Sequence, residues 1–465
     1  MSRDLLTVEA RRENAAALAS ALGISLDEAA HALDLRIAVT ADPRDAVACA
    51  VAEEVISLLS RTVQDVSSEV ADAVITAELI IGCTAPRTSA LPVYLAIDAD
   101  QFSISRERHA TQTSARIPAL FRLLAACYAS GVTLYHALGG SLPFTIPDPL
   151  TVEFRQLGVN LADLKHPIDI GRTYLAGAGA IGNGFLWAAR HLQLRGQLDV
   201  VDDDDVSSGN LNRQIWFDKT DITLPKTERL VAHAQPHFPH LTLKPRTSRL
   251  QGLPERSDGG SWLRRLIVAV DSRRARRALQ NEFPHEVFDA STTDIREVVL
   301  HHHVQPTQNA CMSCIYEPDA EESTREQHIA DHLGVTLEDV RSERVSPAAA
   351  ATIAERYPQL AQSNLVGIAY DTLFKNLCAE GALTTLEGKR VIAPFAFVSV
   401  LAGTMLALEL VRRLSAGAIS HDDNYWRISP WHPPLARRRI LRPRQPGCLF
   451  CADPVLTAAK QSLWG

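Results

Sequence analysis

The sequence lacks several features that define other classes of protein. It contains no run of about eighteen apolar residues, the length that a membrane-spanning helix requires. Its beginning has charges scattered through it and lacks the apolar segment of a signal peptide. It shows no internal repeat, no low-complexity tract and no excess of positive charge, since the formal net charge is −7. We therefore expect a cytoplasmic protein that binds neither nucleic acid nor a membrane surface.

Cysteine is scarce, with 8 residues in a chain of 465, which is typical of a protein from a reducing compartment. Four of the eight form two C-x-x-C pairs, Cys311/Cys314 and Cys448/Cys451. Two such pairs can enclose a zinc ion in a tetrahedral site that has no open position for catalysis. We expect a structural Zn²⁺ at these cysteines; redox dithiols or unrelated surface cysteines are the alternatives.

Three consecutive histidines, His301 to His303, precede the first cysteine pair. In a strand the first and third of them share one face, and the second faces the other way. No nearby pattern of carboxylates completes a metal site with them. We therefore expect these histidines on a half-exposed strand at the edge of a sheet.

A chain of 465 residues is longer than one hydrophobic core usually supports, so at least two domains are expected. The 46% hydrophobic content is enough to build their cores. Residues 1–150 alternate helical and strand-like patterns, such as a helix over 45–60, and predict an N-terminal α/β domain without a glycine-rich phosphate loop. Residues 151–465 predict a Rossmann-like domain, a parallel sheet covered by helices. Within it, the polar helical pattern of residues 319–390 predicts a helical insertion before a long apolar helix.

A glycine-rich turn begins the second domain. Gly177, Gly179 and Gly182 fit the pattern G-x-G-x-x-G between a predicted strand and a predicted helix. Small residues at such a turn let backbone N–H groups and the helix N-terminus face a phosphate chain. Asp202 ends the next strand, where a carboxylate can bind ribose hydroxyls. These residues alone fit an NAD(P) oxidoreductase as well as an ATP-dependent enzyme.

The residues after Asp202 separate the two interpretations. The stretch DDDDVSSGNLNRQ contains Arg213 among amide side chains, and Lys226 follows Pro225 at a predicted helix start. Hydride transfer needs no strong cations beside the phosphates, whereas adenylate formation must neutralise the charge of a triphosphate. The cations therefore favour an ATP-dependent enzyme.

Taken together, GAGAIG, VDDDDV, NLNRQ, PK and VAVDSRRAR resemble the ThiF/MoeB and ubiquitin-activating enzyme superfamily over roughly residues 165 to 455. The layout is similar to that of a bacterial enzyme that activates a ubiquitin-like protein. The resemblance implies adenylation of the C-terminal carboxylate of such a protein, with ATP and Mg²⁺. It implies roles in ribose, phosphate and metal binding for a set of residues: Asp202 for ribose, Asp204 for the metal-triphosphate end, Asn210, Arg213, Gln214 and Lys226 for the phosphates, and Asp271 for Mg²⁺ and the attacking carboxylate.

The N-terminal domain resembles in layout a degenerate adenylation half, which implies a homodimer or a pseudo-dimer of two halves. In the resembled family an arginine from an N-terminal segment or a partner subunit reaches the γ-phosphate. Arg155 and Arg172 are among the candidates for it.

Ubiquitin-type members of the family pass the acyl group to a catalytic cysteine and then to a conjugating enzyme. Cys378 is the candidate, because it follows a predicted helix near Gly381 with Lys375 one turn away. An inert buried cysteine fits the same pattern. Simple members carry a cysteine where Thr384 and Thr385 stand here.

The expected function is therefore ATP-dependent activation of a ubiquitin-like protein with thioester transfer, which would suit a bacterial antiphage conjugation system. The alternatives are a sulfur-carrier adenylyltransferase without thioester transfer and a nucleotide-sensing module without turnover.

Overall fold

The computed structural model of the protein describes residues 5–68, 74–108, 113, 117–257, 259–318, 320–342, 344–368, 370, 373–374, 377, 393–415 and 422–465. The chain forms two compact units. The first consists of Met1–Tyr316 and Ile392–Gly465, and the second of Glu317–Val391.

The N-terminal part of the first unit is built on a six-stranded sheet with the strand order β2-β1-β3-β4-β5-β6. Strands β2, β1, β3 and β4 run parallel to one another, and β5 pairs antiparallel with both β4 and β6. Helices α3 and α4 pack on the sheet and on each other. The elements are α1 (Val8–Leu22), α2 (Leu26–Ala32), β1 (Arg36–Ala41), α3 (Ala46–Leu59), β2 (Asp65–Ser67), β3 (Ala77–Ile81), β4 (Leu91–Ile97), β5 (Gln101–Ser105), α4 (Ala119–Ala137) and β6 (Leu150–Glu153).

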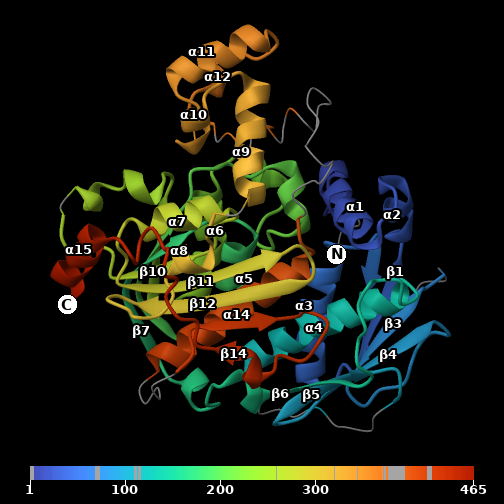
Figure 1. The fold of residues 1–465 in the computed structure, drawn as a ribbon. Helices are drawn as coiled ribbons and strands as arrows, with labels where there is room; N and C mark the ends of the chain where they lie inside the picture. Colours follow the sequence, from blue (N-terminus) through green and yellow to red (C-terminus); the bar gives the residue numbers. More distant parts are fainter. Residues whose placement is uncertain are drawn as a thin grey trace. The chain divides into compact units, whose positions relative to one another are not determined.

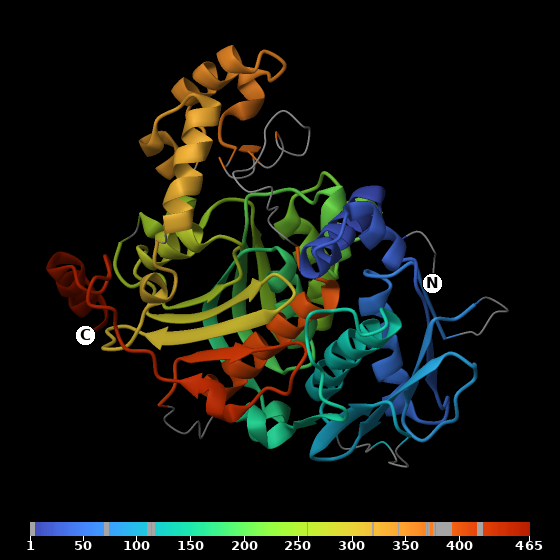
Figure 2. The same cartoon turned by 45° about the vertical axis from the view of Figure 1, so that its right-hand side comes forward.

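The remainder of the first unit is built on an eight-stranded sheet with the order β14-β13-β12-β11-β10-β7-β8-β9. The strands from β9 to β11 are parallel, and β12, β13 and β14 add an antiparallel edge. Figure 2 shows this sheet, coloured green to red, beside the blue and cyan N-terminal sheet. The elements are β7 (Ile168–Ala176), α5 (Ala180–Ala189), β8 (Leu194–Val201), α6 (Lys226–Ala234), β9 (Leu241–Arg246), β10 (Arg265–Val268), α7 (Arg273–Gln280), β11 (Glu286–Thr293), β12 (Glu297–Val304), α8 (Met312–Ile315), α14 (Ala396–Leu414), β13 (Tyr425–Ile428), β14 (Arg439–Ile440) and α15 (Pro454–Trp464).

The long helix α14 joins the two parts into one core (Figure 1). It packs against α4 on the N-terminal side and against α5, β11 and β12 on the other. Nearly all of its residues are buried, which explains why the helix is apolar along most of its length, up to the ion pairs of Glu409 with Arg412 and Arg413. A Cβ atom added at Gly403 would lie 2.1 Å from the carbonyl carbon of Gly184 in α5. Glycine at this position therefore permits the close approach of the two helices.

The predicted α/β class is confirmed, since both sheets are largely parallel and carry helices. Asp45 begins α3 as its N-cap, because its side chain accepts the free N–H groups of Val47 and Ala48. In the part of the chain that the structure describes, we find no helix with the length and apolar character needed to span a bilayer.

The histidine triplet lies on a strand as expected, but the prediction of a half-exposed sheet edge is wrong. Strand β12 lies between β11 and β13, and His301, His302 and His303 are only 1%, 8% and 3% exposed. The edge is covered by strands that come more than a hundred residues later in the chain, which no local pattern reveals. Burial lowers the pKa of His301 to about 3.

The second unit contains four described helices, α9 (Ala320–Leu333), α10 (Leu337–Arg341), α11 (Pro347–Arg356) and α12 (Gln362–Leu365). It has its own small core, whose buried members include Leu333, Ile353 and Phe374. Thr336 and Ser346 begin α10 and α11 as N-caps. This unit lies between the last residues of α8 and the start of α14 along the chain.

Candidate functional site

The glycine turn connects β7 to α5 at the carboxyl end of the parallel strands. Gly177 has φ of +102°, and a Cβ atom there would lie 2.7 Å from the carbonyl oxygen of Ala269. A Cβ atom at Gly182 would lie 2.1 Å from the oxygen of Gly177. At Gly179, the N-cap of α5, an added Cβ atom would meet nothing within 4 Å. The first and third glycines therefore close the turn, and the second leaves room beside the helix N-terminus.

Asp202 follows β8 and contacts this turn directly. Its Oδ2 accepts the backbone N–H of Ala178 at 2.7 Å, and its Oδ1 accepts that of Asp204 at 2.9 Å. Burial and the nearby Asp204 raise the pKa of Asp202 to about 6, although Lys226 opposes the change. The structure thus holds this carboxylate next to the backbone of the glycine turn.

Lys226 is the first residue of α6 and forms an ion pair with Asp204, with Nζ and Oδ2 separated by 2.8 Å. Pairing between Asp205 and Pro225 holds the two segments together. Burial alone would lower the pKa of Lys226, but the negative charges of Asp202, Asp204 and Asp271 raise it overall. Lys226 is therefore the shared cation of several carboxylates.

Arg213 lies in the stretch between β8 and α6 that we call the 207–217 segment. Its guanidinium Nη1 donates to the oxygen of Gly209 at 3.2 Å and to Oδ1 of Asn212 at 2.8 Å. Burial lowers the pKa of Arg213, whereas the charges of Glu13 and Asp271 raise it. Two positively charged side chains, Arg213 and Lys226, thus share Asp271 as an electrostatic neighbour.

The amides of the same segment have different surroundings. The side chain of Asn210 accepts the N–H of Ser207 at 3.1 Å and so stabilises the local turn. The side-chain oxygen of buried Gln214 has no hydrogen-bond partner among the residues that the structure describes. Asn183 of α5 donates to the oxygens of Ala178 and Gly179 and accepts the N–H of Trp216. It thereby links the 207–217 segment to the glycine turn.

Asp271 follows β10 and is exposed, just before Ser272 begins α7 as its N-cap. The backbone before it is held by Arg276, which is buried and donates to the oxygens of Val270 and Ala290 and to the carboxylate of Asp289. Arg276 therefore ties the segment that follows β10 to the middle of β11, behind Asp271.

The structure brings most of the predicted site residues to one place. The glycine turn, both cations and their acidic neighbours are linked by the contacts and charges described above. Arg155 and Arg172 are held elsewhere: Arg155 pairs with Glu153, and Arg172 pairs with Asp199 and Glu255.

Cys378 lies outside the described residues, as do Lys375, Gly381, Thr384 and Thr385. Its predicted role as a thioester cysteine stays a prediction.

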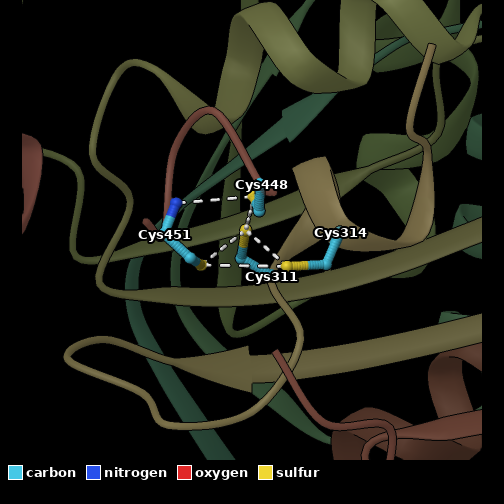
Figure 3. A group of neighbouring side chains, drawn as sticks. All are labelled: Cys311, Cys314, Cys448 and Cys451. Atoms are coloured by element: carbon cyan, nitrogen blue, oxygen red, sulfur yellow. Dashed lines mark hydrogen bonds between the residues drawn. The ribbon is translucent and has the colours of Figure 1, made fainter. Parts of the chain in front are cut away.

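The four paired cysteines form a separate buried cluster (Figure 3). Their sulfur atoms lie within 4.8 Å of one another. The distances are 3.8 Å for Cys311–Cys314, 3.9 Å for Cys311–Cys448, 3.9 Å for Cys314–Cys451 and 3.1 Å for Cys451–Cys311. Zinc–sulfur bonds of about 2.3 Å in a tetrahedron separate the sulfurs by about 3.8 Å. Three of the four distances match this geometry, so the donor set could hold a zinc ion.

Several residues of the site were missed by the sequence analysis. Asn183 and Arg276 hold the backbone beside the glycine turn and before Asp271. Asn212 lies inside NLNRQ and accepts a hydrogen bond from Arg213, a role that the residue type alone does not indicate. Asn14 and Arg61 come from the N-terminal domain and contact the 207–217 segment. No sequence signal connects them to it, because they lie about 150 to 200 positions away.

Two family models match parts of the chain. A model of the E1 N-terminal domain matches residues 7–160, and a model of the ThiF family matches residues 159–450. The protein y4jF of Sinorhizobium fredii (strain NBRC 101917 / NGR234) is 31% identical over 266 residues, which cover 54% of this chain and 50% of that protein. The chain thus spans about half the length of this relative. The solved structure of E. coli MccB with MccA-N7isoASN has a TM-score of 0.36 and 14% identity, and the match covers 70% of this chain and 74% of that one. Because the ThiF match extends over more than half of the 465 residues, the chain belongs to the ThiF family of adenylyltransferase-type enzymes.

Proposed function

We propose that this protein uses MgATP to adenylate the C-terminal carboxylate of a ubiquitin-like protein. One observation carries the proposal, namely the group of acidic and basic side chains beside the glycine turn: Asp202, Asp204, Arg213, Lys226 and Asp271. A dinucleotide site for hydride transfer has no need of two cations there, whereas a triphosphate that is about to be cleaved does.

In the proposed reaction a carboxylate oxygen attacks the α-phosphorus of ATP. The bond from this phosphorus to the oxygen it shares with the β-phosphate breaks, pyrophosphate leaves with the electron pair, and an acyl adenylate forms. Both reactants are anions, so Arg213 and Lys226 reduce their repulsion and stabilise charge on the phosphoryl oxygens. Asp202 accepts hydrogen bonds from the ribose hydroxyls.

Two metals belong to this proposal. Asp271 offers an exposed carboxylate oxygen at the end of β10, the type of ligand that Mg²⁺ prefers. When bound, Mg²⁺ supplies further neutralisation of phosphate charge. The four buried cysteines would hold a structural Zn²⁺ that joins α8 and its N-cap to the turn before α15.

We assign the N-terminal domain the part of a degenerate adenylation half, so that one chain forms a pseudo-dimer of halves. Its four parallel strands and its match to the E1 N-terminal domain support this assignment. The second unit is assigned as the insertion that carries the catalytic cysteine. There the thiolate of Cys378 would attack the acyl carbon, AMP would leave, and a conjugating enzyme would take the acyl group, as in a bacterial antiphage conjugation system.

The test is ATP–pyrophosphate exchange in the presence of purified ubiquitin-fold proteins that end in a free carboxylate. We expect exchange with at least one of them and none with the same protein bearing a C-terminal carboxamide, which cannot form the adenylate. Lys226→Met should lower the rate about a hundredfold, because the loss of one transition-state cation costs on the order of 3 kcal/mol. Lys219→Met removes an exposed lysine from a neighbouring turn and should leave the rate unchanged.

Exchange at the wild-type rate in Lys226→Met would contradict the assignment, and so would exchange with the carboxamide. A thiol-cleavable adduct that Cys378→Ala abolishes would support thioester transfer. A fully active Cys378→Ala variant without such an adduct would support a sulfur-carrier adenylyltransferase instead.

A further inference from the structure

Arg61, which follows α3, reaches from the N-terminal domain into the 207–217 segment. It is only 5% exposed. Its guanidinium donates to three backbone oxygens, those of Leu211 at 2.5 Å, Ile215 at 2.8 Å and Phe217 at 2.9 Å. One side chain therefore fixes the backbone on both sides of Arg213.

Asn14 of α1 extends this contact to the side chain of Arg213. It is 1% exposed, and its Nδ2 donates to the oxygen of Arg61 at 2.7 Å. Its Oδ1 accepts the Nδ2 of Asn212 at 2.9 Å, and the Oδ1 of Asn212 accepts Nη1 of Arg213 at 2.8 Å. An unbroken series of hydrogen bonds thus runs from the N-terminal domain to the guanidinium of Arg213.

Burying the charge of Arg61 carries a large desolvation cost for a contact that serves stability alone. Among the described residues no carboxylate forms an ion pair with Arg61, so a buried positive charge rests on backbone oxygens. Burial lowers its pKa to about 10, although Asp218 opposes the change. Even buried ion pairs can often be replaced by apolar side chains of similar volume without loss of stability, so a buried charge is weak evidence for a stabilising role. The distinctive consequence of the polar contacts is instead the geometry that they impose on the segment.

We propose that Asn14 is a positioning residue that acts through Asn212 on Arg213. The N-terminal domain would thereby set, within one chain, the orientation of the cation that meets the triphosphate. This inference rests on the proposed function, since it takes Arg213 to be a ligand of the ATP phosphates. It goes beyond that function because it gives the N-terminal domain a direct part in the site.

The test measures binding of Mg²⁺ with α,β-methylene-ATP, which cannot be cleaved at the α-phosphorus, and binding of AMP, by calorimetry on the full chain. We expect Asn14→Ala to weaken binding of the triphosphate analogue about tenfold, the effect of a displaced charged hydrogen bond. AMP binding should change less than twofold, because AMP has no β- or γ-phosphate. Asn212→Ala interrupts the same series from the other side and should give the same result if Asn14→Ala does not fold.

A double-mutant cycle separates positioning from general stability. In an Arg213→Lys background, Asn14→Ala should change the affinity for the analogue less than twofold, because the guanidinium that Asn14 positions is gone. Tyr128→Phe is the matched control. The Tyr128 hydroxyl also donates from the N-terminal domain to the Rossmann-like domain, but its acceptor, the oxygen of Ser429, lies away from the site. It should bind both nucleotides as the wild type does.

Equal weakening in both backgrounds, or equal weakening for AMP and the analogue, would overturn the inference. Unchanged affinity in Asn14→Ala and Asn212→Ala would overturn it as well, while leaving the proposed function in place. If the wild-type protein does not bind Mg²⁺ with α,β-methylene-ATP at all, the proposed function fails, and the inference fails with it.

Discussion

The glycine turn allows a sharp separation of folding from nucleotide binding. Gly179 and Gly182 are three residues apart on the same turn, yet their surroundings differ. A Cβ atom at Gly182 would lie 2.1 Å from a backbone oxygen, whereas one at Gly179 would meet nothing within 4 Å. The same substitution, glycine to alanine, should therefore have opposite consequences at the two positions.

At Gly182 the added methyl group must displace backbone by about 1 Å, since both colliding groups belong to the main chain. Overpacking of this kind costs about 1 to 3 kcal/mol, and we take the upper value because no flexible side chain can move aside. Against a total stability of roughly 5 to 15 kcal/mol, such a loss is large. We expect Gly182→Ala to lower the apparent melting temperature by several degrees.

At Gly179 the backbone has φ of −75°, which alanine adopts without strain. Alanine is a poorer N-cap than glycine, but it also reduces the entropy of the unfolded chain, and both effects amount to less than about 1 kcal/mol. Stability should therefore hardly change. In the proposed ATP site, the methyl group would instead occupy the space through which phosphates approach the backbone N–H groups. We expect the affinity for Mg²⁺ with α,β-methylene-ATP to fall at least tenfold, or about 1.4 kcal/mol.

Thermal unfolding and calorimetric titration of the two variants would decide the matter. Wild-type affinity in Gly179→Ala would mean that the phosphate chain does not lie over this part of the turn. A Gly182→Ala protein as stable as the wild type would mean that the turn is looser than the structure indicates. Either result would contradict the steric difference between Gly179 and Gly182.

Three further predictions follow from charge and metal binding. Desolvation and the nearby Asp204 raise the pKa of Asp202 to about 6, so affinity for MgATP should increase as the pH is raised through 6. Stability of the free protein should decrease between about pH 4 and 6 as this carboxyl ionises. Titrations at several pH values should show both trends in the wild type and neither in Asp202→Asn. Metal analysis should find one zinc ion per chain, and either Cys314→Ser or a chelator should lower the melting temperature. A metal-free protein that melts at the wild-type temperature would contradict a structural zinc. Glu54 of α3 forms an ion pair with Arg190 of α5 across the two domains. Glu54→Gln should lower the free energy of urea unfolding by about 3 kcal/mol, because the buried arginine loses its counter-charge. Glu53→Gln, a change at an exposed neighbour, should leave that free energy unchanged.

The motifs that the sequence displays are those whose chemistry is local. The glycine turn, the acidic strand end and the cysteine pairs each lie within a few residues, because a phosphate-binding turn or a pair of metal ligands must be built from neighbouring atoms. The α/β class followed from the alternation of strand and helix patterns, and it is confirmed. The roles of the individual site residues stay predictions.

Other features were decided only by tertiary structure. Strand β12, which carries the three histidines, is an inner strand because β13 pairs with it from a distant part of the chain. The hold of Asn14 and Arg61 on the segment around Arg213 joins residues from different domains. Contacts of this kind leave no periodicity or spacing in the sequence, because any two surfaces of matching shape and polarity can make them. The order of residues along the chain fixes which chemical groups are present and which local turns hold them. Packing between distant segments fixes which of these groups meet.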